Sequence, residues 1–300
     1  MIRDSEIKRS QPIRRAVIWI LVAVYTYLLP YFYLIYRAIL DHYGKEVVGR
    51  VPLFIVAVFG FAYSAAVLRM RKNPRYLLFL IPCAIIAVVI MRLEPNPNKH
   101  IHIPQYILMA WLLYAAISKD YKGKGLFTLI FFYASLLGIV DELEQGIHPS
   151  RFYGWSDMLV NSSSGIIGIF TILGLKQVQP GDWEWTAYLR KFKWLILLNL
   201  VGMAGAAAML VTLFQVQAAE VFEGVYPGWL QAWNLAFVIL APLAVIMHLK
   251  INRSHQESGL IDKELSGERT ARLWVYPLLA ILWYMHFLLV FVSVTGTVFK

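Results

Sequence analysis

Residues 138–168, GIVDELEQGIHPSRFYGWSDMLVNSSSGIIG, place ionisable side chains inside otherwise apolar sequence. Apolar residues lead into Asp141 and Glu142, a short loop carries Arg151, and apolar sequence resumes around Asp157. Ionisable groups at membrane depth are costly, so where they occur they indicate function. We therefore expect the rest of the chain to be organised around this stretch.

The spacing of the polar residues in this stretch predicts two polar helix faces. Glu142 and Gln145 are three positions apart, and Asp157 and Asn161 are four apart. On helices, residues at these spacings share a face. Two glycines follow Asn161 at four and seven positions, and such small residues let a second membrane helix come close.

The composition is that of a polytopic membrane protein. The 300 residues are 59% hydrophobic and only 15% charged, and the mean hydropathy is +0.59, which excludes an ordinary soluble domain. The net charge of +10 does not indicate nucleic acid as a partner, because the basic residues stand in short clusters between apolar runs and no binding motif accompanies them. The single cysteine, Cys83, excludes a disulfide framework and a thiolate metal site.

Nine apolar runs are long enough to cross a membrane as helices of roughly 17 to 25 residues. They lie at about residues 16–40, 52–70, 76–93, 102–118, 126–147, 157–176, 194–217, 231–250 and 272–299. The first run is too long for a signal-peptide core. We predict an all-α fold, a polytopic transmembrane bundle of about nine helices, with residues 251–271 as a solvated linker.

The basic residues predict the orientation of this bundle. Of the 28 Lys and Arg residues, 21 fall in alternate connections, those around residues 3–15, 69–75, 119–124, 176–193 and 250–272. Positively charged connections stay in the cytoplasm. We therefore predict a cytoplasmic N-terminus and an extracytoplasmic C-terminus, with residues 94–101, 141–156 and 218–230 on the outer side.

A second polar element, EPNPNKHIH at residues 94–102, precedes the central stretch. His102 and Tyr106 are four positions apart and share a helix face, and Lys99 stands just before them. These three side chains offer a cation, an imidazole and a phenol close to the membrane surface. We expect them to join the carboxylates of residues 138–168 in one outward cluster.

These residues resemble the pattern of the VanZ-like family of integral membrane proteins. That pattern is a Lys-x-x-His-x-x-x-Tyr element, an acidic pair with Gln three residues after the Glu, a Pro-Gly-Arg turn, and Asp-x-x-x-Asn-x-x-x-Gly. The matching positions here are Lys99, His102, Tyr106, Asp141, Glu142, Gln145, Arg151, Asp157, Asn161, Gly165 and Gly168. His-Pro-Ser-Arg at 148–151 replaces the usual turn, and Gln105 stands where many members have Glu.

The resemblance covers about residues 76–176 and divides the chain into three segments. Residues 1–75 hold two N-terminal helices, residues 76–176 form a VanZ-like four-helix membrane domain, and residues 177–300 hold three C-terminal helices. The family is named for a protein associated with teicoplanin resistance. The resemblance therefore implies a multi-pass protein of the bacterial cytoplasmic membrane, a cell-envelope context and membrane lipids as neighbours, but no particular reaction.

We expect an outward-facing polar, acidic cavity that binds or chemically processes a cell-envelope or lipid-linked substrate. The catalytic candidates are His102, Glu142 and Asp141, because partial burial can tune an imidazole or a carboxylate for proton transfer. The substrate-binding candidates are Lys99, Tyr106, Gln145, Arg151, Asp157 and Asn161. Among these, Lys99 and Arg151 would hold an anionic head group.

Other interpretations of the same residues stay open. The polar side chains can form a purely structural network, and the protein can be a non-catalytic accessory or scaffold subunit that binds a partner in a larger membrane complex. A transporter is disfavoured, because the sequence shows no internal repeat and no paired broken helices. Imidazole and carboxylates suit several divalent ions, but their spacing here is not that of a metal motif, so we assign no metal ligand and no cofactor.

Overall fold

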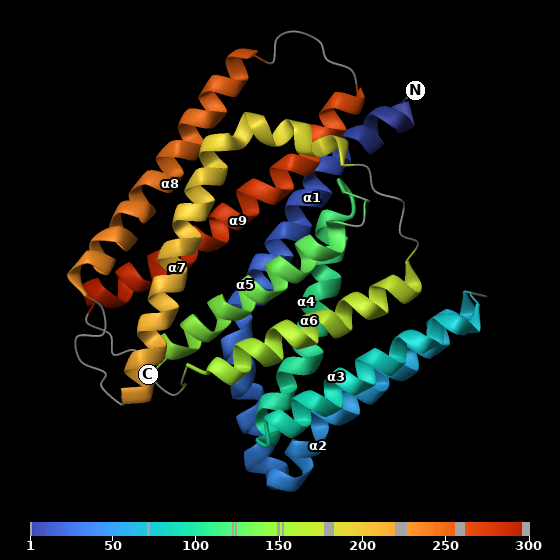
Figure 1. The fold of residues 1–300 in the computed structure, drawn as a ribbon. Helices are drawn as coiled ribbons and strands as arrows, with labels where there is room; N and C mark the ends of the chain where they lie inside the picture. The colour runs from blue at the N-terminus through green and yellow to red at the C-terminus, as the bar shows by residue number, and fades with distance from the viewer. Residues whose placement is uncertain are drawn as a thin grey trace. The chain divides into compact units, whose positions relative to one another are not determined.

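The computed structural model describes residues 2–70, 73–121, 123, 125–148, 151, 153–176, 183–219, 227–255 and 262–295. Every regular element within these residues is helical (Figure 1). Nine helical segments among them are long and apolar enough to cross a membrane. The prediction of an all-α bundle with nine spans is therefore confirmed for the described part of the chain.

The elements follow one another with short connections. They are α1 (Ile2–Leu28), η1 (Leu29–Tyr31), α2 (Phe32–Arg69), η2 (Pro74–Phe79), α3 (Leu80–Leu93), η3 (Pro97–Ile101), α4 (His102–Ile117), α5 (Gly125–Ile147), α6 (Trp155–Leu175), η4 (Glu184–Phe192), α7 (Lys193–Ala219), α8 (Gly228–His255) and α9 (Asp262–Thr295), where η marks a 3₁₀ helix. Most spans begin and end within a few residues of the predicted runs. The seventh begins earlier, at Trp185 instead of 194, because η4 continues directly into α7.

Two backbone breaks, not a long loop, shape the first two spans. Pro30 lies in η1, where α1 gives way to α2; proline lacks the N–H that would continue an α-helix. Within α2, Gly44 has φ +79° and ψ 168°, which is not helical. Glycine adopts a positive φ without steric cost. The first span therefore ends at Gly44, and the second, Gly49–Arg69, follows almost at once.

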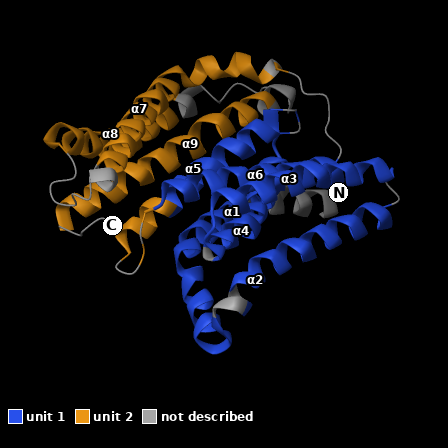
Figure 2. Ribbon diagram, turned by 60° about the horizontal axis from the view of Figure 1, so that its bottom comes forward, with its two compact units in different colours: residues 1–141, 154–181 blue, residues 142–153, 182–300 orange. Residues whose placement is uncertain are grey.

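The chain divides into two compact units (Figure 2). The first contains Met1–Asp141 and Gly154–Gly181, and the second contains Glu142–Tyr153 and Asp182–Lys300. The boundary falls inside the continuous helix α5, between two consecutive residues. This division differs from the three segments drawn from the sequence, because the N-terminal helices pack onto the helices of the matched region.

The centre of the first unit is the pair α4 and α6, which pack closely together. The span that contains α4 is 67% buried, whereas the span that contains α3 is 11% buried. Helices α1 and α2 pack against α4, and α3 packs against α6. Helices α1, α2 and α6 therefore pack around α4, which carries several of the predicted site residues.

Glycines on α6 permit this close packing. A Cβ atom at Gly168 would lie 2.6 Å from the Cβ of Ala110 and 3.0 Å from the carbonyl oxygen of Ile107, both on α4. A Cβ atom at Gly165 would lie 3.2 Å from the Cβ of Ala134 on α5. The prediction that this face lets another helix come close is confirmed.

The second unit is built around α9, which packs against both α7 and α8. His286 on α9 is fully buried. Its Nδ1 lies 2.6 Å from Oδ1 of Asn234, and its Nε2 lies 3.1 Å from the carbonyl oxygen of Gly202. A Cβ atom at Gly205 would lie 2.8 Å from Cε1 of the ring. The glycines of α7 therefore let α8 and α9 come close, and His286 is a packing residue within this contact.

The polar segment predicted as a solvated linker, residues 251–271, is helical wherever it is described. Helix α8 continues to His255 and α9 begins at Asp262. Glu268 supports the first turns of α9, because its carboxylate contacts Arg272 at 2.5 Å and Lys191 at 3.1 Å. Ion pairs at the i,i+4 spacing stabilise polar helix turns. The polar composition of this segment suggested a linker because composition does not show such pairing.

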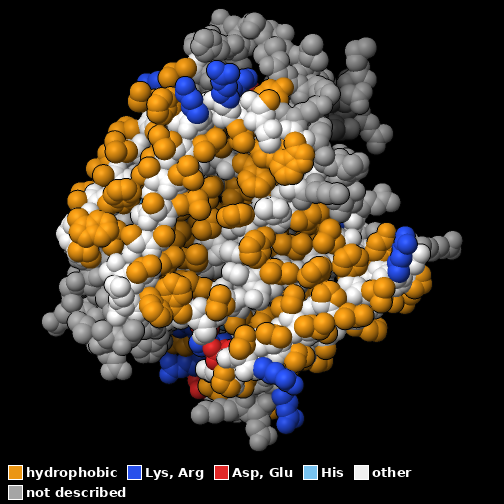
Figure 3. All heavy atoms as spheres, viewed as in Figure 1, with side chains coloured by type: hydrophobic (Ala, Val, Ile, Leu, Met, Phe, Trp, Pro, Cys, Tyr) orange, Lys and Arg blue, Asp and Glu red, His pale blue; other side chains and the backbone are white. Residues whose placement is uncertain are grey.

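The outer faces of the helices are apolar. Phe61 is 76% exposed and Val294 is 79% exposed. On the face shown in Figure 3, hydrophobic side chains cover most of the described surface, while Lys and Arg lie towards its margins. So much exposed apolar surface is unusual in a soluble monomer and is expected where helices meet lipid.

Cys83, predicted to lie inside the third span, is buried on α3.

Candidate functional site

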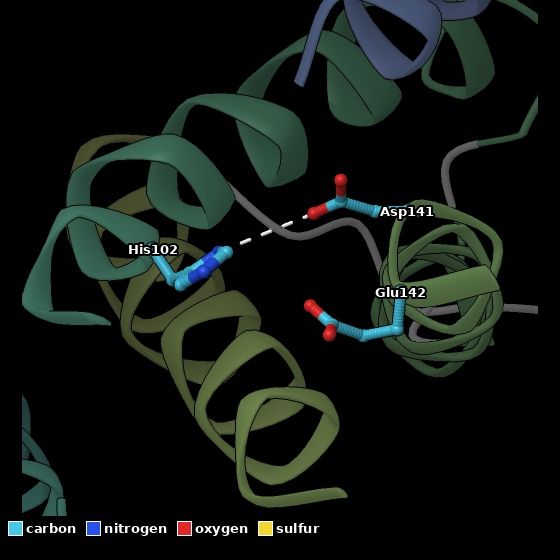
Figure 4. Close-up of side chains that lie close together, drawn as sticks. All are labelled: His102, Asp141 and Glu142. Atoms are coloured by element: carbon cyan, nitrogen blue, oxygen red, sulfur yellow. Dashed lines mark ion pairs between the residues drawn. The ribbon is translucent and has the colours of Figure 1, made fainter. Parts of the chain in front are cut away.

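Three ionisable side chains converge near the start of α4 and the last two turns of α5. One ligand atom each from His102, Asp141 and Glu142 lies within 4.8 Å of the other two. The Nδ1 of His102 is 4.0 Å from Oδ2 of Asp141. The exposed fractions are 5%, 1% and 0%, so the three groups are screened from solvent. Figure 4 shows the imidazole and both carboxylates directed towards one another. These are the three predicted catalytic candidates, and the structure brings them together.

A hydrogen bond from a neighbouring side chain holds each carboxylate in place. The hydroxyl of Tyr106 donates to Oδ2 of Asp141 at 3.2 Å. The amide Nε2 of Gln145 donates to Oε1 of Glu142 at 3.1 Å. Tyr106 follows His102 by one turn of α4, with the two ring centroids 6.4 Å apart. The shared helix faces predicted from the spacing are confirmed, and they fix the orientation of the acidic side chains.

Arg151 extends this cluster through an amide. Its guanidinium Nη2 donates to Oε1 of Gln145, and its backbone N–H donates to the carbonyl oxygen of His148 at 3.1 Å. Residues 149 and 150 of the predicted turn lie outside the described residues. The half-buried Arg151 and the fully buried Glu142 are therefore joined through one side-chain amide.

A second polar network surrounds Lys99 in η3. Its Nζ lies 3.1 Å from Oδ1 of Asp157 and 3.2 Å from Oε2 of Glu94. It also lies 3.0 Å from Oγ of Ser156, whose hydroxyl donates to Oε2 of Glu94 at 2.9 Å. Asp157 sits in the first turn of α6, where a negative charge is favoured by the helix dipole. This network attaches η3 and the chain after α3 to the start of α6.

Sequence reasoning missed two members of the Lys99 network. Glu94 opened the polar element at residues 94–102 but received no role, and Ser156 was not considered. The two residues are 62 positions apart, so no helical spacing connects them. The one available signal was the position of Ser156 directly before Asp157.

Asn161 is fully buried on α6, where its Nδ2 donates to the carbonyl oxygen of Gly138 on α5 at 3.5 Å. A Cβ atom at Gly138 would lie 2.9 Å from the Cβ of Asn161, so the two helices touch at this point. Asn161 therefore joins α5 and α6 about one helical turn before Asp141 and Glu142. Six of the nine predicted residues gather in the acidic cluster: His102, Tyr106, Asp141, Glu142, Gln145 and Arg151.

An apolar pocket of about 330 Å³ lies beside α4 in the first unit. Its lining comes from α1, α2, η3 and α4 and includes Tyr25, Tyr36, Phe59, Pro104, Gln105 and Leu108. The hydroxyl of Tyr25 donates to the backbone carbonyl of Gln105 at 2.9 Å. Gln105 directly precedes Tyr106 on α4, so one helix contributes to both the pocket and the acidic cluster. The sequence predicted a polar cavity; the pocket described here is apolar.

Comparison of the chain with models of protein families, with curated proteins and with solved structures found no match. The resemblance to the VanZ-like proteins therefore rests on the residue pattern alone.

The Lys99 network predicts a pH-dependent contribution to stability. Burial alone would raise the pKa of Glu94, but hydrogen bonds from Ser156 and Lys99 and the charge of Lys99 together hold this pKa below its ordinary value of 4.5. A carboxylate with a lowered pKa stabilises the folded chain above its unfolded pKa, and this contribution is lost as the pH falls through the folded pKa. We expect the melting temperature of the wild type to fall below about pH 4.5 partly for this reason.

Glu94→Gln should remove that part of the pH dependence, and Ser156→Ala should reduce it by raising the pKa of Glu94. The effect at neutral pH should be small, about 0.2 to 1 kcal/mol, as for other partly exposed ion pairs. Melting curves of the three proteins, recorded between pH 3 and pH 7 at intervals of ~1 pH unit, test this. Parallel curves for the wild type and Glu94→Gln would contradict the assignment.

Proposed function

We propose that the chain is a VanZ-like membrane protein of the cell envelope whose buried polar site binds or processes an anionic, lipid-linked substrate. The observation that carries this proposal is the convergence of His102, Asp141 and Glu142 within 4.8 Å at buried positions of membrane-spanning helices. Burying ionisable groups at such depth is expensive. We therefore infer that the ionisable groups of this site have a chemical role.

The ordering of the side chains around the cluster supports a functional site over a packing contact. Tyr106 and Gln145 each donate to one carboxylate, which leaves an imidazole and two oriented acidic groups facing a common centre. His102 and Glu142 would exchange protons with the substrate as general acid and base. Asp141 would orient the imidazole of His102.

A lipid-linked substrate is favoured by the pocket beside the site. The pocket of about 330 Å³ is lined mainly by apolar side chains from three spans, and a hydrocarbon chain could lie there with little desolvation cost. Gln105 borders the pocket, and the next residue on α4 belongs to the acidic cluster. A substrate with its chain in the pocket would therefore have its head group close to His102.

Of the two predicted anion-binding cations, we assign the head group to Arg151. Lys99 lies against two carboxylates and a hydroxyl, so its charge is already balanced and it positions the start of α6. Arg151 is half-buried, and its guanidinium contacts Gln145 of the acidic cluster. Its planar guanidinium suits bidentate binding of a phosphate or carboxylate.

The test is the lipid that the purified full-length protein retains. We expect a lipid with an anionic head group to be enriched over the bulk membrane, as measured by mass spectrometry after extraction from the washed protein. Arg151→Gln should lose this enrichment, and Arg190→Gln, which changes an exposed arginine of η4, should keep it. Bulk lipid composition in the wild type would contradict the proposal, and a protein partner recovered in fixed stoichiometry instead would favour the accessory-subunit alternative.

Membrane orientation supplies a separate prediction. Because 21 of the 28 basic residues fall in alternate connections, we expect a tag before Met1 to be cytoplasmic and a tag after Lys300 to be extracytoplasmic. Protease protection of both tags in intact cells and in inverted vesicles measures this. Tags on the same side would contradict the nine-span topology and would remove the outward orientation of the acidic cluster.

A further inference from the structure

The acidic cluster has the composition of a metal centre. His102 supplies an imidazole nitrogen, and Asp141 and Glu142 each supply a carboxylate oxygen, all within 4.8 Å of one another. Imidazole combined with carboxylates suits divalent transition metals. Catalytic zinc sites typically have three protein ligands, and water or substrate takes the fourth position. Ca²⁺ and Mg²⁺ are disfavoured, because they prefer ligand sets made of oxygen alone.

The distances are compatible with such a cation. An ion at the centre of three atoms that lie within 4.8 Å of one another would be no more than about 2.8 Å from each, whereas Zn–N and Zn–O bonds are about 2.0 to 2.2 Å long. Side-chain movements of well under ~1 Å would close this difference. Figure 4 shows that all three side chains already point to that centre.

Two further side chains stand where metal sites have outer-shell groups. Ligands of a metal are usually held by hydrogen bonds from outer-shell residues, which fix their orientation. Here the hydroxyl of Tyr106 donates to Asp141 and the amide of Gln145 donates to Glu142. Each donor lies about one helical turn after a ligand on the same helix, Tyr106 after His102 and Gln145 after Glu142.

We propose that His102, Asp141 and Glu142 bind one divalent transition-metal cation, with Zn²⁺ as the representative ion. The cation would offset the negative charge of two buried carboxylates. The inference rests on the proposed function in one respect: with the cation bound, His102 and Glu142 would serve as ligands instead of exchanging protons with the substrate. The cation, together with Arg151, would then receive the anionic part of the substrate. It departs from the sequence-based assignment, which gave the chain no metal ligand.

The experiment is Zn²⁺ binding by the purified full-length protein after treatment with a chelator. Isothermal titration should give one Zn²⁺ per chain, and Zn²⁺ should raise the melting temperature, because a ligand that binds only the folded state stabilises it. Tyr106→Phe, which removes an outer-shell donor, should weaken binding by about 10- to 100-fold. His102→Gln should weaken it further. His248→Gln is the control, since His248 lies on α8 and packs its ring against Phe192 at 5.1 Å.

Each result bears on the proposal. No Zn²⁺ binding by the wild type, or equal binding by His102→Gln, overturns it; loss in His248→Gln as well would mean that the measured binding comes from histidines in general and overturns it too. If His102→Gln does not fold, Glu142→Gln and Asp141→Asn preserve side-chain shape and are expected to show the same loss. Enrichment of an anionic lipid without Zn²⁺ binding would refute the metal and keep the proposed function. Zn²⁺ binding without lipid enrichment would do the reverse.

Discussion

Glu142→Gln and His102→Gln should each abolish a cell-envelope phenotype while leaving the melting temperature nearly unchanged. Both substitutions replace an ionisable group by an uncharged amide of similar size at a buried position. The amide at position 142 can still pair with Gln145, so the local hydrogen bond survives. Proton transfer cannot survive, and loss of a general acid or base typically lowers a rate by about 10²- to 10⁴-fold.

Glu144→Gln is the matched control for this prediction. Glu144 lies on the same helix two positions after Glu142, and its Oε1 accepts a hydrogen bond from the hydroxyl of Tyr284 at 2.7 Å. It should therefore keep function. Protein abundance, melting temperature and glycopeptide susceptibility of a bacterial host should be measured for all three variants. Normal function in well-folded Glu142→Gln and His102→Gln would refute a chemical role, and a loss of folding that precedes the loss of function would indicate a structural network.

Local spacing predicted the parts of this fold that depend on one helix at a time. The apolar runs gave the nine spans, because a membrane helix needs a fixed length of apolar sequence. The separation of Glu142 from Gln145 predicted a shared face, and the structure confirms it with a hydrogen bond. The glycines after Asn161 predicted a close helix contact, which Gly168 makes with Ala110. Each of these inferences needs only the geometry of an α-helix.

Contacts between distant residues were beyond the reach of spacing. The hydrogen bond of Ser156 with Glu94 and the pairing of Asn161 with Gly138 depend on which helices become neighbours, and periodicity does not determine that choice. The polar turns at the start of α9 were missed for a similar reason. Glu268 is paired with Lys191, which is 77 positions away, so composition alone indicated a linker.

Gly168→Ala should destabilise the protein, whereas Gly60→Ala should not. The new methyl group at position 168 would meet Ala110 at 2.6 Å and the backbone oxygen of Ile107 at 3.0 Å, and a backbone atom cannot turn aside as the end of a long side chain can. Overpacking of this kind costs about 1 to 3 kcal/mol. A Cβ atom at Gly60 would have nothing within 4 Å, so alanine there brings only its better helix propensity, worth up to about 1 kcal/mol.

Melting temperatures of the two variants in the same detergent measure this difference, and the expected shifts have opposite signs. A Gly168→Ala protein that melts with the wild type would show that α4 and α6 are less closely packed than described. The substitution also bears on the acidic cluster, because α4 carries His102 and Tyr106. If α4 moves by about 1 Å to relieve the clash, activity could fall as much as 10²-fold. Gly168→Ala should therefore lose stability and function together, in contrast to Glu142→Gln, which should lose function alone.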